Sequence, residues 1–322
     1  MKSDNKERKE KKIEAIPVAF AIDNNYLLAT DVAICSLLLS DPHENYDFFI
    51  IHSTPINEDD KLKLINDVKR LSYFSNVNFI LMANIFKHGF ADRWFNTSCY
   101  NLIMISWLLP EHSKVIYSDS DVIFKTGLRE LYETVDIENF YIAGVNYKKF
   151  NDPVEPMYSH IKSLGLKPSE YINDGLMIIN CDLQRKHNLL PQFIKLIGKP
   201  FHCLDQDIIN LVCKGKIFHI DRSYNVDPRR EEPDIKNPKI LHFIGAKKPW
   251  NKITSSWEEW AKPYKESSFF NPIFYKNSKR IIRKNIIAKY KKQLIKSMPS
   301  RLLQLLIFTR NCLQYPKSKR IT

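Results

Sequence analysis

Short apolar runs alternate with helix-like segments over the first part of this 322-residue chain, and that alternation limits the fold more than any other feature. Each run has the length of a strand, and in each following segment apolar residues recur every three or four positions. Strands are expected at residues 16–22, 47–52, 77–81 and 114–117, and helices at 26–39, 58–71 and 100–109. Repeated strand–helix units predict an α/β fold in which helices cover both faces of a mostly parallel sheet.

Beyond residue 122, further strands are expected at 141–145, 176–180, 216–220 and 240–244, with longer polar connections between them. The chain contains neither GxGxxG nor GxxxxGK followed by Ser or Thr, so the usual dinucleotide and P-loop signatures are absent. Ligands of open α/β sheets bind at the carboxyl ends of strands. Polar residues that directly follow an apolar run are therefore the candidate site residues.

The positive charge of the chain is concentrated at one end. The formal net charge is +13, and residues 276–322 contain 14 Lys and Arg with no Asp or Glu, so residues 1–275 together carry −1. This distribution argues against a uniformly basic nucleic-acid-binding domain, and we expect no nucleic acid partner. Within the basic segment, Ile282, Ile286, Tyr290 and Leu294 recur every four residues among Lys and Arg. The repeat predicts an amphipathic helix at an anionic membrane surface, or alternatively a helix packed on the rest of the protein with a solvated basic face.

The rest of the composition indicates a cytoplasmic protein. Residues 1–12 are charged and contain no apolar signal-peptide core, and no stretch approaches the ~20 apolar residues of a spanning helix. The six cysteines form no CxxC pair, which favours a reducing compartment over a zinc site or a disulfide framework. We expect a disordered charged arm at 1–13, one domain at 14–265 and a basic, membrane-associating tail at 266–322.

The main chemical signal is Asp119-Ser120-Asp121, which follows the apolar run 115–118. In an extended chain, residues i and i+2 point to the same side, so the two carboxylates can meet at one point. Two carboxylates at the end of a strand suit a hard divalent cation such as Mn2+ or Mg2+. The alternative is a pair of aspartates in a surface loop.

A second signal lies far along the chain, in the segment that starts at His242 and ends at Trp250. A neutral imidazole can serve as a third ligand for the cation. Gly245 lets the backbone approach a phosphate, and Lys248 can neutralise its charge. The alternative is a structural histidine followed by a turn.

Three further polar segments are candidates for binding a nucleotide or a sugar. Asp23 and Asn25 follow the first strand, where they can bind a nucleobase and ribose or cap the next helix. Asn173-Asp174-Gly175 and Asp205-Gln206-Asp207 carry the amide and carboxylate groups that recognise sugar hydroxyls. Asp205 can alternatively cap a helix that begins there.

The layout of these five segments resembles that of the retaining glycosyltransferases of family 8, over about residues 16–262. This family includes lipopolysaccharide and lipooligosaccharide galactosyl- and glucosyltransferases of Gram-negative bacteria, and glycogenin. The segment Ala-Ile-Asp-Asn-Asn-Tyr at 21–26 resembles the family's uridine-binding first loop, and Asp119-Ser120-Asp121 resembles its metal-binding DxD. Asn173-Asp174-Gly175 resembles its Asn-Ala/Ser-Gly segment, Asp205-Gln206-Asp207 its DQD, and residues 242–250 its HxxGxxKPW.

The resemblance implies a GT-A-type, Rossmann-like nucleotide-sugar-binding domain with a mostly parallel mixed sheet. It implies retaining, metal-dependent transfer of a hexose, galactose or glucose, from a UDP-sugar to a glycan or glycolipid acceptor such as lipopolysaccharide. The protein would then act at the cytoplasmic face of the bacterial inner membrane. The implied contacts are Ala21, Asp23 and Asn25 with uridine, Asp119, Asp121 and His242 with Mn2+ or Mg2+, Gly245 and Lys248 with the diphosphate, and Asn173, Asp205 and Gln206 with the donor sugar. Asp205 and Gln206 are the candidate catalytic residues, and Gln206 stands where a weak nucleophile or a charge stabiliser would act.

Two residues depart from the family pattern: Leu102 stands where many members have Arg, and Asp174 replaces Ala or Ser. Both changes fall near the donor sugar, so its identity stays open. Two other classes of protein compete with this interpretation. A haloacid-dehalogenase-like phosphatase would use Asp119 and Asp121 but on an early strand, whereas here three strand–helix units precede them. A non-enzymatic, basic membrane-surface protein would have to carry five polar segments by accident.

Overall fold

The computed structural model describes residues 14–83, 85–86, 97–230, 232 and 234–297. The chain divides into two compact units, Met1–Phe270 and Asn271–Thr322. The arm expected at residues 1–13 and the end of the expected tail, residues 298–322, lie outside the described residues.

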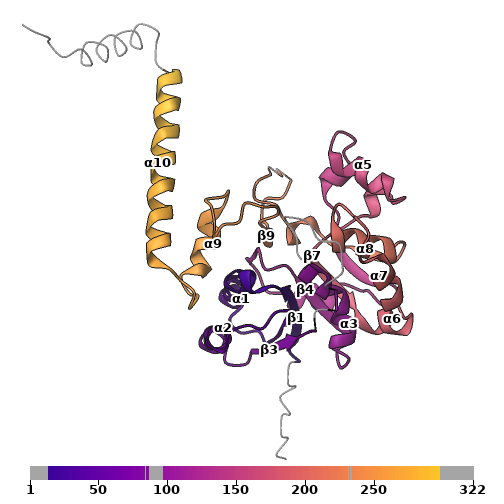
Figure 1. The fold of residues 1–322 in the computed structure, drawn as a ribbon. Coiled ribbons are helices and arrows are strands. Elements are labelled where there is room, and N and C mark those ends of the chain that lie inside the picture. Colours follow the sequence, from indigo (N-terminus) through magenta and orange to yellow (C-terminus); the bar gives the residue numbers. More distant parts are fainter. Residues whose placement is uncertain (1–13, 84, 87–96, 231, 233, 298–322) are drawn as a thin grey trace, which may run out of the picture. The chain divides into compact units, whose positions relative to one another are not determined.

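The first unit is built on a seven-stranded mixed sheet with the strand order β3-β2-β1-β4-β7-β6-β8 (Figure 1). Neighbouring strands from β3 to β4 are parallel, as are β6 and β8, whereas β7 runs antiparallel to both β4 and β6. The expected α/β fold with a mostly parallel mixed sheet is therefore confirmed. The strands are β1 (Ile16–Ile22), β2 (Tyr46–His52), β3 (Asn76–Leu81), β4 (Lys114–Ser118), β6 (Ile142–Val145), β7 (Asn173–Asn180) and β8 (Ile217–His219).

Helices cover both faces of this sheet, as the sequence alternation predicts. Val18 and Phe20 of β1 face one apolar layer, which they share with residues of α1 (Leu27–Ser40) and α2 (Glu58–Leu71). Ala19 faces the other layer, together with residues of α3 (Ile105–Leu108) and α8 (Leu204–Val212). Because successive residues of β1 enter opposite layers, the whole run is apolar rather than alternating.

The other elements of this unit are short. The further helices are α4 (Arg129–Thr134), α5 (Pro156–Ser163), α6 (Cys181–Lys186), α7 (Leu190–Leu196) and α9 (Trp257–Tyr264). Short 3-10 helices lie at Asn24–Tyr26, Lys148–Asn151, Pro168–Glu170 and Arg222–Tyr224. A 3-10 helix at Thr97–Met104, followed by α3, replaces the α-helix expected at 100–109. Tyr100, Leu102 and Ile103 are all buried there, so tertiary packing rather than helix propensity determines the backbone.

A separate two-stranded ribbon pairs β5 (Val122–Phe124) with β9 (Ile240–His242) in antiparallel fashion. The strand expected at 240–244 is therefore shorter than the sequence suggests and lies outside the seven-stranded sheet. Since β5 directly follows Asp121, the ribbon brings a distant part of the chain to the carboxyl end of β4.

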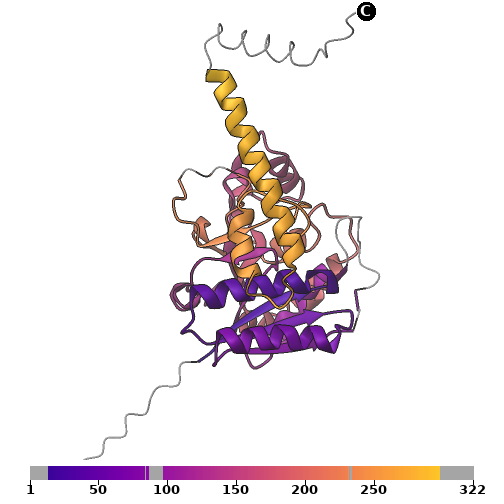
Figure 2. The ribbon, with the colours of Figure 1, turned by 90° about the vertical axis from the view of Figure 1, so that its left-hand side faces the viewer.

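The second unit contains α10 (Pro272–Ser297), an unbroken helix of 26 residues (Figure 2). Ile286 and Tyr290 of the expected apolar stripe are exposed, but so are Ile281 and Ile287, which lie off that stripe because successive residues turn by about 100°. The helix therefore exposes apolar side chains on more than one side. Among the described residues, no helix has both the length and the apolar character needed to cross a membrane.

Candidate active site

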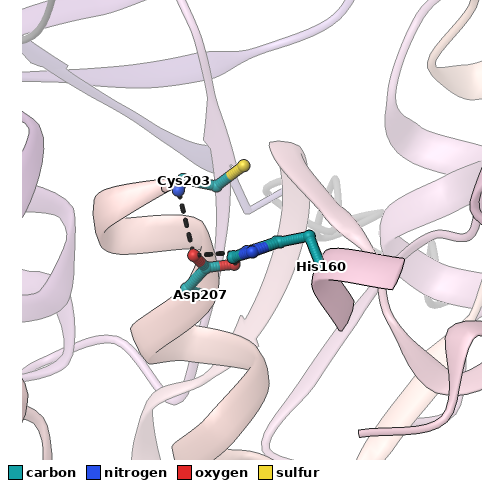
Figure 3. A group of neighbouring side chains, drawn as sticks. All are labelled: His160, Cys203 and Asp207. Carbon is teal, nitrogen blue, oxygen red and sulfur yellow. Dashed lines mark hydrogen bonds and ion pairs between the residues drawn. The ribbon is translucent and has the colours of Figure 1, made fainter. Parts of the chain in front are cut away.

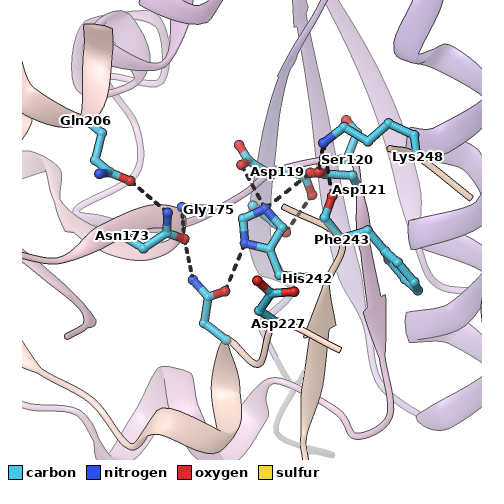
Figure 4. A network of polar contacts seen from close by, with 12 residues as sticks. Asp119, Ser120, Asp121, Asn173, Gly175, Gln206, Asp227, His242, Phe243 and Lys248 are labelled. Atoms are coloured by element: carbon cyan, nitrogen blue, oxygen red, sulfur yellow. Dashed lines mark hydrogen bonds and ion pairs between the residues drawn. The ribbon is translucent and has the colours of Figure 1, made fainter. Parts of the chain in front are cut away.

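Asp119 and Asp121 follow β4 at the middle of the sheet (Figure 4). Ser120 between them turns toward α1, where its hydroxyl oxygen lies 2.8 Å from Thr30 Oγ1. The two carboxylates instead face the same imidazole, that of His242. The alternation of side chains along an extended segment thus produces the pair of carboxylates that the Asp-x-Asp spacing predicts.

His242 reaches these carboxylates through the β5–β9 ribbon. The register of the ribbon places His242 opposite Val122, the residue after Asp121. His242 Nε2 lies 3.4 Å from Asp119 Oδ2 and 3.4 Å from Asp121 Oδ1. The ligand atoms of the three side chains all lie within 4.8 Å of one another. The structure therefore brings together the three residues that the sequence assigns to a cation.

Gly175 makes room for the histidine ring. Since β7 runs opposite to β4, the first residues of β7 rather than its last lie at the same edge of the sheet as Asp119. The Asp119 amide donates to the Gly175 carbonyl at 2.9 Å. A Cβ at Gly175 would lie 2.6 Å from His242 Nδ1 and 3.0 Å from Asp119 Oδ2. Any larger residue would displace the imidazole.

Lys248 places its positive charge next to the buried carboxylate of Asp121 (Figure 4). Its Nζ donates to Asp121 Oδ2 and, at 3.1 Å, to the Phe243 carbonyl. Burial acts to raise the pKa of Asp121, but the charges of Lys248 and His242 outweigh burial and hold that pKa below the ordinary carboxyl range. Burial likewise acts to lower the pKa of His242, but Asp121 and Asp119 raise it to about 9. Lys248 and His242 therefore stabilise the negatively charged form of Asp121.

The cluster of Asp119, Asp121 and His242 fits a divalent cation. It offers carboxylate oxygens and an imidazole nitrogen, and Mn2+ accepts both donor types. Two other groups of described residues also combine metal-binding side-chain types: His160 with Cys203 and Asp207, and Asp31 with Cys35 and Asp67. Burial raises the thiol pKa of Cys203 and of Cys35, which opposes the thiolate that a metal needs.

Asn173 and Gln206, which are assigned to the donor sugar, lie on the side of His242 that faces away from Asp121 and Lys248. Asn173 Nδ2 donates to Gln206 Oε1 at 2.7 Å, and both side chains are buried (Figure 4). Burial and the charge of Asp119 raise the pKa of Asp205 to about 8. Burial also raises the pKa of Asp174 well above its ordinary value, and Asp205 and Asp119 add to the rise. The unusual Asp174 thus belongs to the same acidic cluster as Asp205 and Asp119.

The segment assigned to uridine lies at the same edge of the sheet. Ala19 of β1 pairs with Tyr117 of β4, and two residues further along these strands are Ala21 and Asp119. Asp23 Oδ1 accepts the amide of Asn25 at 2.7 Å, so Asp23 does cap the short helix that follows, and Asn25 is exposed. The ring of the next residue, Tyr26, packs edge-on against Trp250 with 5.6 Å between centroids. This contact joins the first loop to the segment that begins at His242.

Gly245 adopts the left-handed backbone conformation, with φ of 82°, that favours glycine. A Cβ at this position would lie 3.0 Å from Arg229 Nη1. Arg229 is held by Asp227 through a hydrogen bond of 2.7 Å from Nη2 to Oδ2. The structure therefore places a guanidinium beside the backbone to which the sequence assigns the diphosphate.

Sequence reasoning missed Arg229, and it also missed Asn225, whose Oδ1 lies 2.9 Å from His242 Nδ1. Both residues precede β9 in an irregular segment, where no strand-end pattern marks them. The parallel bridge between Val226 and Leu241 is what brings this segment to the site.

Comparison with known proteins identifies the fold and the family. A galactosyltransferase, LgtC, whose structure was solved in complex with donor and acceptor sugar analogs, superimposes with a TM-score of 0.68; the match covers 81% of this chain and 99% of that one, at 20% identity. The fold is therefore the GT-A fold of that enzyme, as expected.

Two relatives match at the sequence level. A putative glycosyltransferase of Haemophilus influenzae is 26% identical over 255 residues, which is 75% of each chain. A lipopolysaccharide 1,3-galactosyltransferase of Salmonella typhimurium is 24% identical over 247 residues, covering 73% of this chain and 72% of that one. Neither the phosphatase alternative nor the non-enzymatic one gains support from the fold or from these matches. The family model of glycosyl transferase family 8 matches residues 17–254, and this chain belongs to that family.

Proposed function

We propose that this protein transfers a hexose, galactose or glucose, from a UDP-sugar to a saccharide acceptor, with the help of a divalent cation and with retention of the anomeric configuration. The observation that carries the proposal is the convergence of Asp119, Asp121 and His242 from β4 and β9. Family membership supports the reaction class. The activity named for the Salmonella relative supports a hexose donor and a lipopolysaccharide acceptor.

In this proposal Asp119, Asp121 and His242 hold Mn2+ or Mg2+. When bound, the cation supplies positive charge that stabilises the diphosphate leaving group. Lys248 adds a second positive charge next to Asp121, and Gly245 lets the backbone come close to the phosphates.

The remaining predicted residues bind the two ends of the donor. Asn173, Asp205 and Gln206 hold the hydroxyl groups of the sugar, and Asp205 and Gln206 stand nearest the chemistry. Ala21, Asp23 and Asn25 bind the uridine at the end of β1. Support for this division comes from the sheet: β1, β4 and the start of β7 open to one edge, with the uridine segment and the sugar segment on opposite sides of Asp119.

We also propose that the acceptor is presented at a membrane, and that the C-terminal unit holds the protein there. Residues 276–322 of this unit contain 14 Lys and Arg and no Asp or Glu. Exposed Ile286 and Tyr290 on α10 add apolar surface. Such a unit suits the anionic cytoplasmic face of the bacterial inner membrane.

A ligand panel tests the proposed function. With Mn2+ present, UDP, UDP-galactose and UDP-glucose should raise the melting temperature of the protein, whereas GDP-sugars should not. The protein should not hydrolyse p-nitrophenyl phosphate. Phosphatase activity that depends on Asp119, without stabilisation by any UDP compound, would favour the phosphatase alternative instead.

A further inference from the structure

A continuous series of hydrogen bonds links the imidazole of His242 to a buried carboxylate on α8. It consists of His242, Asn225, Asn173, Gln206, Tyr171 and Asp207, which we call the polar chain. None of these six residues is more than 8% exposed. Because a buried polar group needs a partner, each donor in the polar chain must face an acceptor. The direction of one hydrogen bond therefore determines the orientation of the next side chain.

The direction of the polar chain is set at Asp207, which Figure 3 shows with its neighbours His160 and Cys203. The Asp207 carboxylate accepts the backbone amide of Cys203 at 2.9 Å and the hydroxyl of Tyr171, and His160 Nε2 lies 2.9 Å from it. Asp207 is thus the acceptor at this end of the polar chain, and Tyr171 is the donor. The Tyr171 hydroxyl therefore donates its hydrogen bond to Asp207, and its oxygen can accept the next hydrogen bond in the polar chain.

The same direction passes through two amide side chains (Figure 4). Gln206 Nε2 donates to the Tyr171 hydroxyl oxygen at 2.9 Å, so Gln206 Oε1 faces Asn173 and accepts from its Nδ2. Asn173 Oδ1 then accepts from Asn225 Nδ2 at 2.8 Å. It also accepts the backbone amide of Gly175 at 3.2 Å. Since a backbone amide can only donate, Gly175 fixes the orientation of Asn173 a second time, independently of Asp207.

The last amide determines which nitrogen of His242 carries a proton. Asn225 presents Oδ1 to His242 Nδ1, and the Tyr147 hydroxyl donates to the same oxygen. An acceptor at this position requires a proton on Nδ1. In the neutral ring the lone pair is then on Nε2, the nitrogen that faces Asp119 and Asp121. With Asn225 reversed, Nδ2 would face the ring and the proton would sit on Nε2, where it would block a cation.

We propose that Asn225 is a positioning residue that holds His242 in the tautomer needed for cation binding, and that the rest of the polar chain fixes the orientation of the Asn225 amide. The inference rests on the proposed function, because it takes His242 as a cation ligand. It adds that the sugar-side residues Asn173 and Gln206 and the cation-side residue His242 are oriented by one set of hydrogen bonds. A substitution of Asn173 or Gln206 should therefore also change the orientation of His242, and the reverse.

Binding of Mn2+ alone, followed by electron paramagnetic resonance of the free ion, tests the role of Asn225. Asn225→Leu keeps the size of the side chain but removes the acceptor, and should raise the Mn2+ dissociation constant about 10- to 100-fold. Asn225→Asp is the rescue variant: its carboxylate still accepts from Nδ1–H, so its affinity should stay within about threefold of the unmodified protein. Equal Mn2+ affinity in the Leu variant and the unmodified protein would overturn the proposal.

The tautomer itself can be read from 15N NMR of the unmodified, histidine-labelled protein loaded with diamagnetic Mg2+, which makes the test independent of how any Asn225 variant folds. The His242 signals are assigned by their loss in His242→Gln. Nδ1 should have the shift of a protonated nitrogen and Nε2 that of an unprotonated one; the reverse assignment would refute the proposal. UDP release assayed in parallel separates the two ideas. Asn225-dependent Mn2+ binding without sugar transfer would refute only the proposed function, whereas Mn2+-dependent transfer with unchanged binding in Asn225→Leu would refute only this inference.

Discussion

Lys248 and Asp121 are separated by 127 positions in the chain, yet the ammonium of the first donates directly to Oδ2 of the second. The other oxygen of Asp121, Oδ1, faces His242. One buried carboxylate is thus shared between the lysine that we assign to the diphosphate and the cluster that we assign to the cation. A cation at Asp121 and the ammonium of Lys248 compete for the same negative charge.

Replacing Lys248 by alanine should separate these two roles. Turnover should fall about 10²- to 10³-fold, because one positive charge on the leaving diphosphate is lost. Mn2+ affinity should rise, because the ammonium no longer competes for Asp121. Lys247→Ala changes an exposed neighbour and is the matched control, which should alter neither quantity. A joint loss of turnover and Mn2+ affinity in Lys248→Ala would contradict the assignment.

Gly175→Ala should abolish Mn2+ binding without unfolding the protein. The added methyl group meets His242 Cε1 and Nδ1 at 2.2 and 2.6 Å, so the ring has to leave Asp119 and Asp121. Calorimetric titration with Mn2+ measures the effect. Gly144→Ala is the control, because the three atoms nearest to its methyl group all belong to the side chain of Ile172. Gly144→Ala should lower the melting temperature but keep Mn2+ affinity. Equal Mn2+ affinities in the two variants would argue against the close contact between Gly175 and His242 that the prediction assumes.

The parts of the fold that follow from local pattern were predictable from the sequence. The run at Ile16–Ile22 is apolar throughout because β1 is buried on both faces, and the sheet type follows from repeating such units with helices. The spacing of Asp119 and Asp121 needs only extended backbone to bring the carboxylates together. His242 could be joined to them only through the family resemblance, since nothing local points from one segment to the other.

What the sequence could not reveal depends on pairing between distant segments. The reversal of β7 places Gly175 next to Asp119, although the start of a strand does not usually lie at the ligand edge of a parallel sheet. Asn225 and Arg229 act through the position of their irregular segment beside β9, which no periodicity records. Packing likewise turned the expected helix at 100–109 largely into 3-10 helix, because residues on all its sides are buried.

Asp31 on α1 should make the stability of the protein depend on pH. It is fully buried, and within the described part of the chain neither carboxylate oxygen has a hydrogen-bond partner. Burial raises the pKa of this carboxyl well above its ordinary value, Ser267 nearby offsets only part of the rise, and the charge of Asp67 adds to it. A group with a raised folded-state pKa contributes stability that is present below its unfolded-state pKa and lost as the pH rises through its folded-state pKa.

Asp31→Asn should therefore stabilise the protein at neutral pH, by about 1–3 kcal/mol in free energy of unfolding, and much less near pH 4. Urea unfolding at several pH values measures the difference. Asp67→Asn is the contrasting variant and should destabilise, because Asp67 accepts hydrogen bonds from Ser268 and Arg70. A stability difference for Asp31→Asn that does not change with pH would count against a raised carboxyl pKa.

Removal of the C-terminal unit should abolish membrane binding and leave donor chemistry intact. A chain that ends at Phe270 should keep UDP-sugar hydrolysis but fail to sediment with anionic vesicles. For the full chain, high salt should weaken binding, since each Lys or Arg near the surface contributes about 1 kcal/mol, but apolar contacts should preserve part of it. Unchanged sedimentation of the shortened chain would show that the basic unit does not hold the protein at the membrane.

The release of UDP from UDP-galactose and UDP-glucose, measured with Mn2+ and again with excess EDTA, tests the central claim most directly. We expect release with Mn2+, loss of release in EDTA, and recovery when Mn2+ is restored. Asp121→Asn and Asp119→Asn, which keep side-chain size but remove a charge, should lose release while retaining their melting temperature within a few degrees. Full release in EDTA, or by either variant, would contradict a cation held by Asp119, Asp121 and His242.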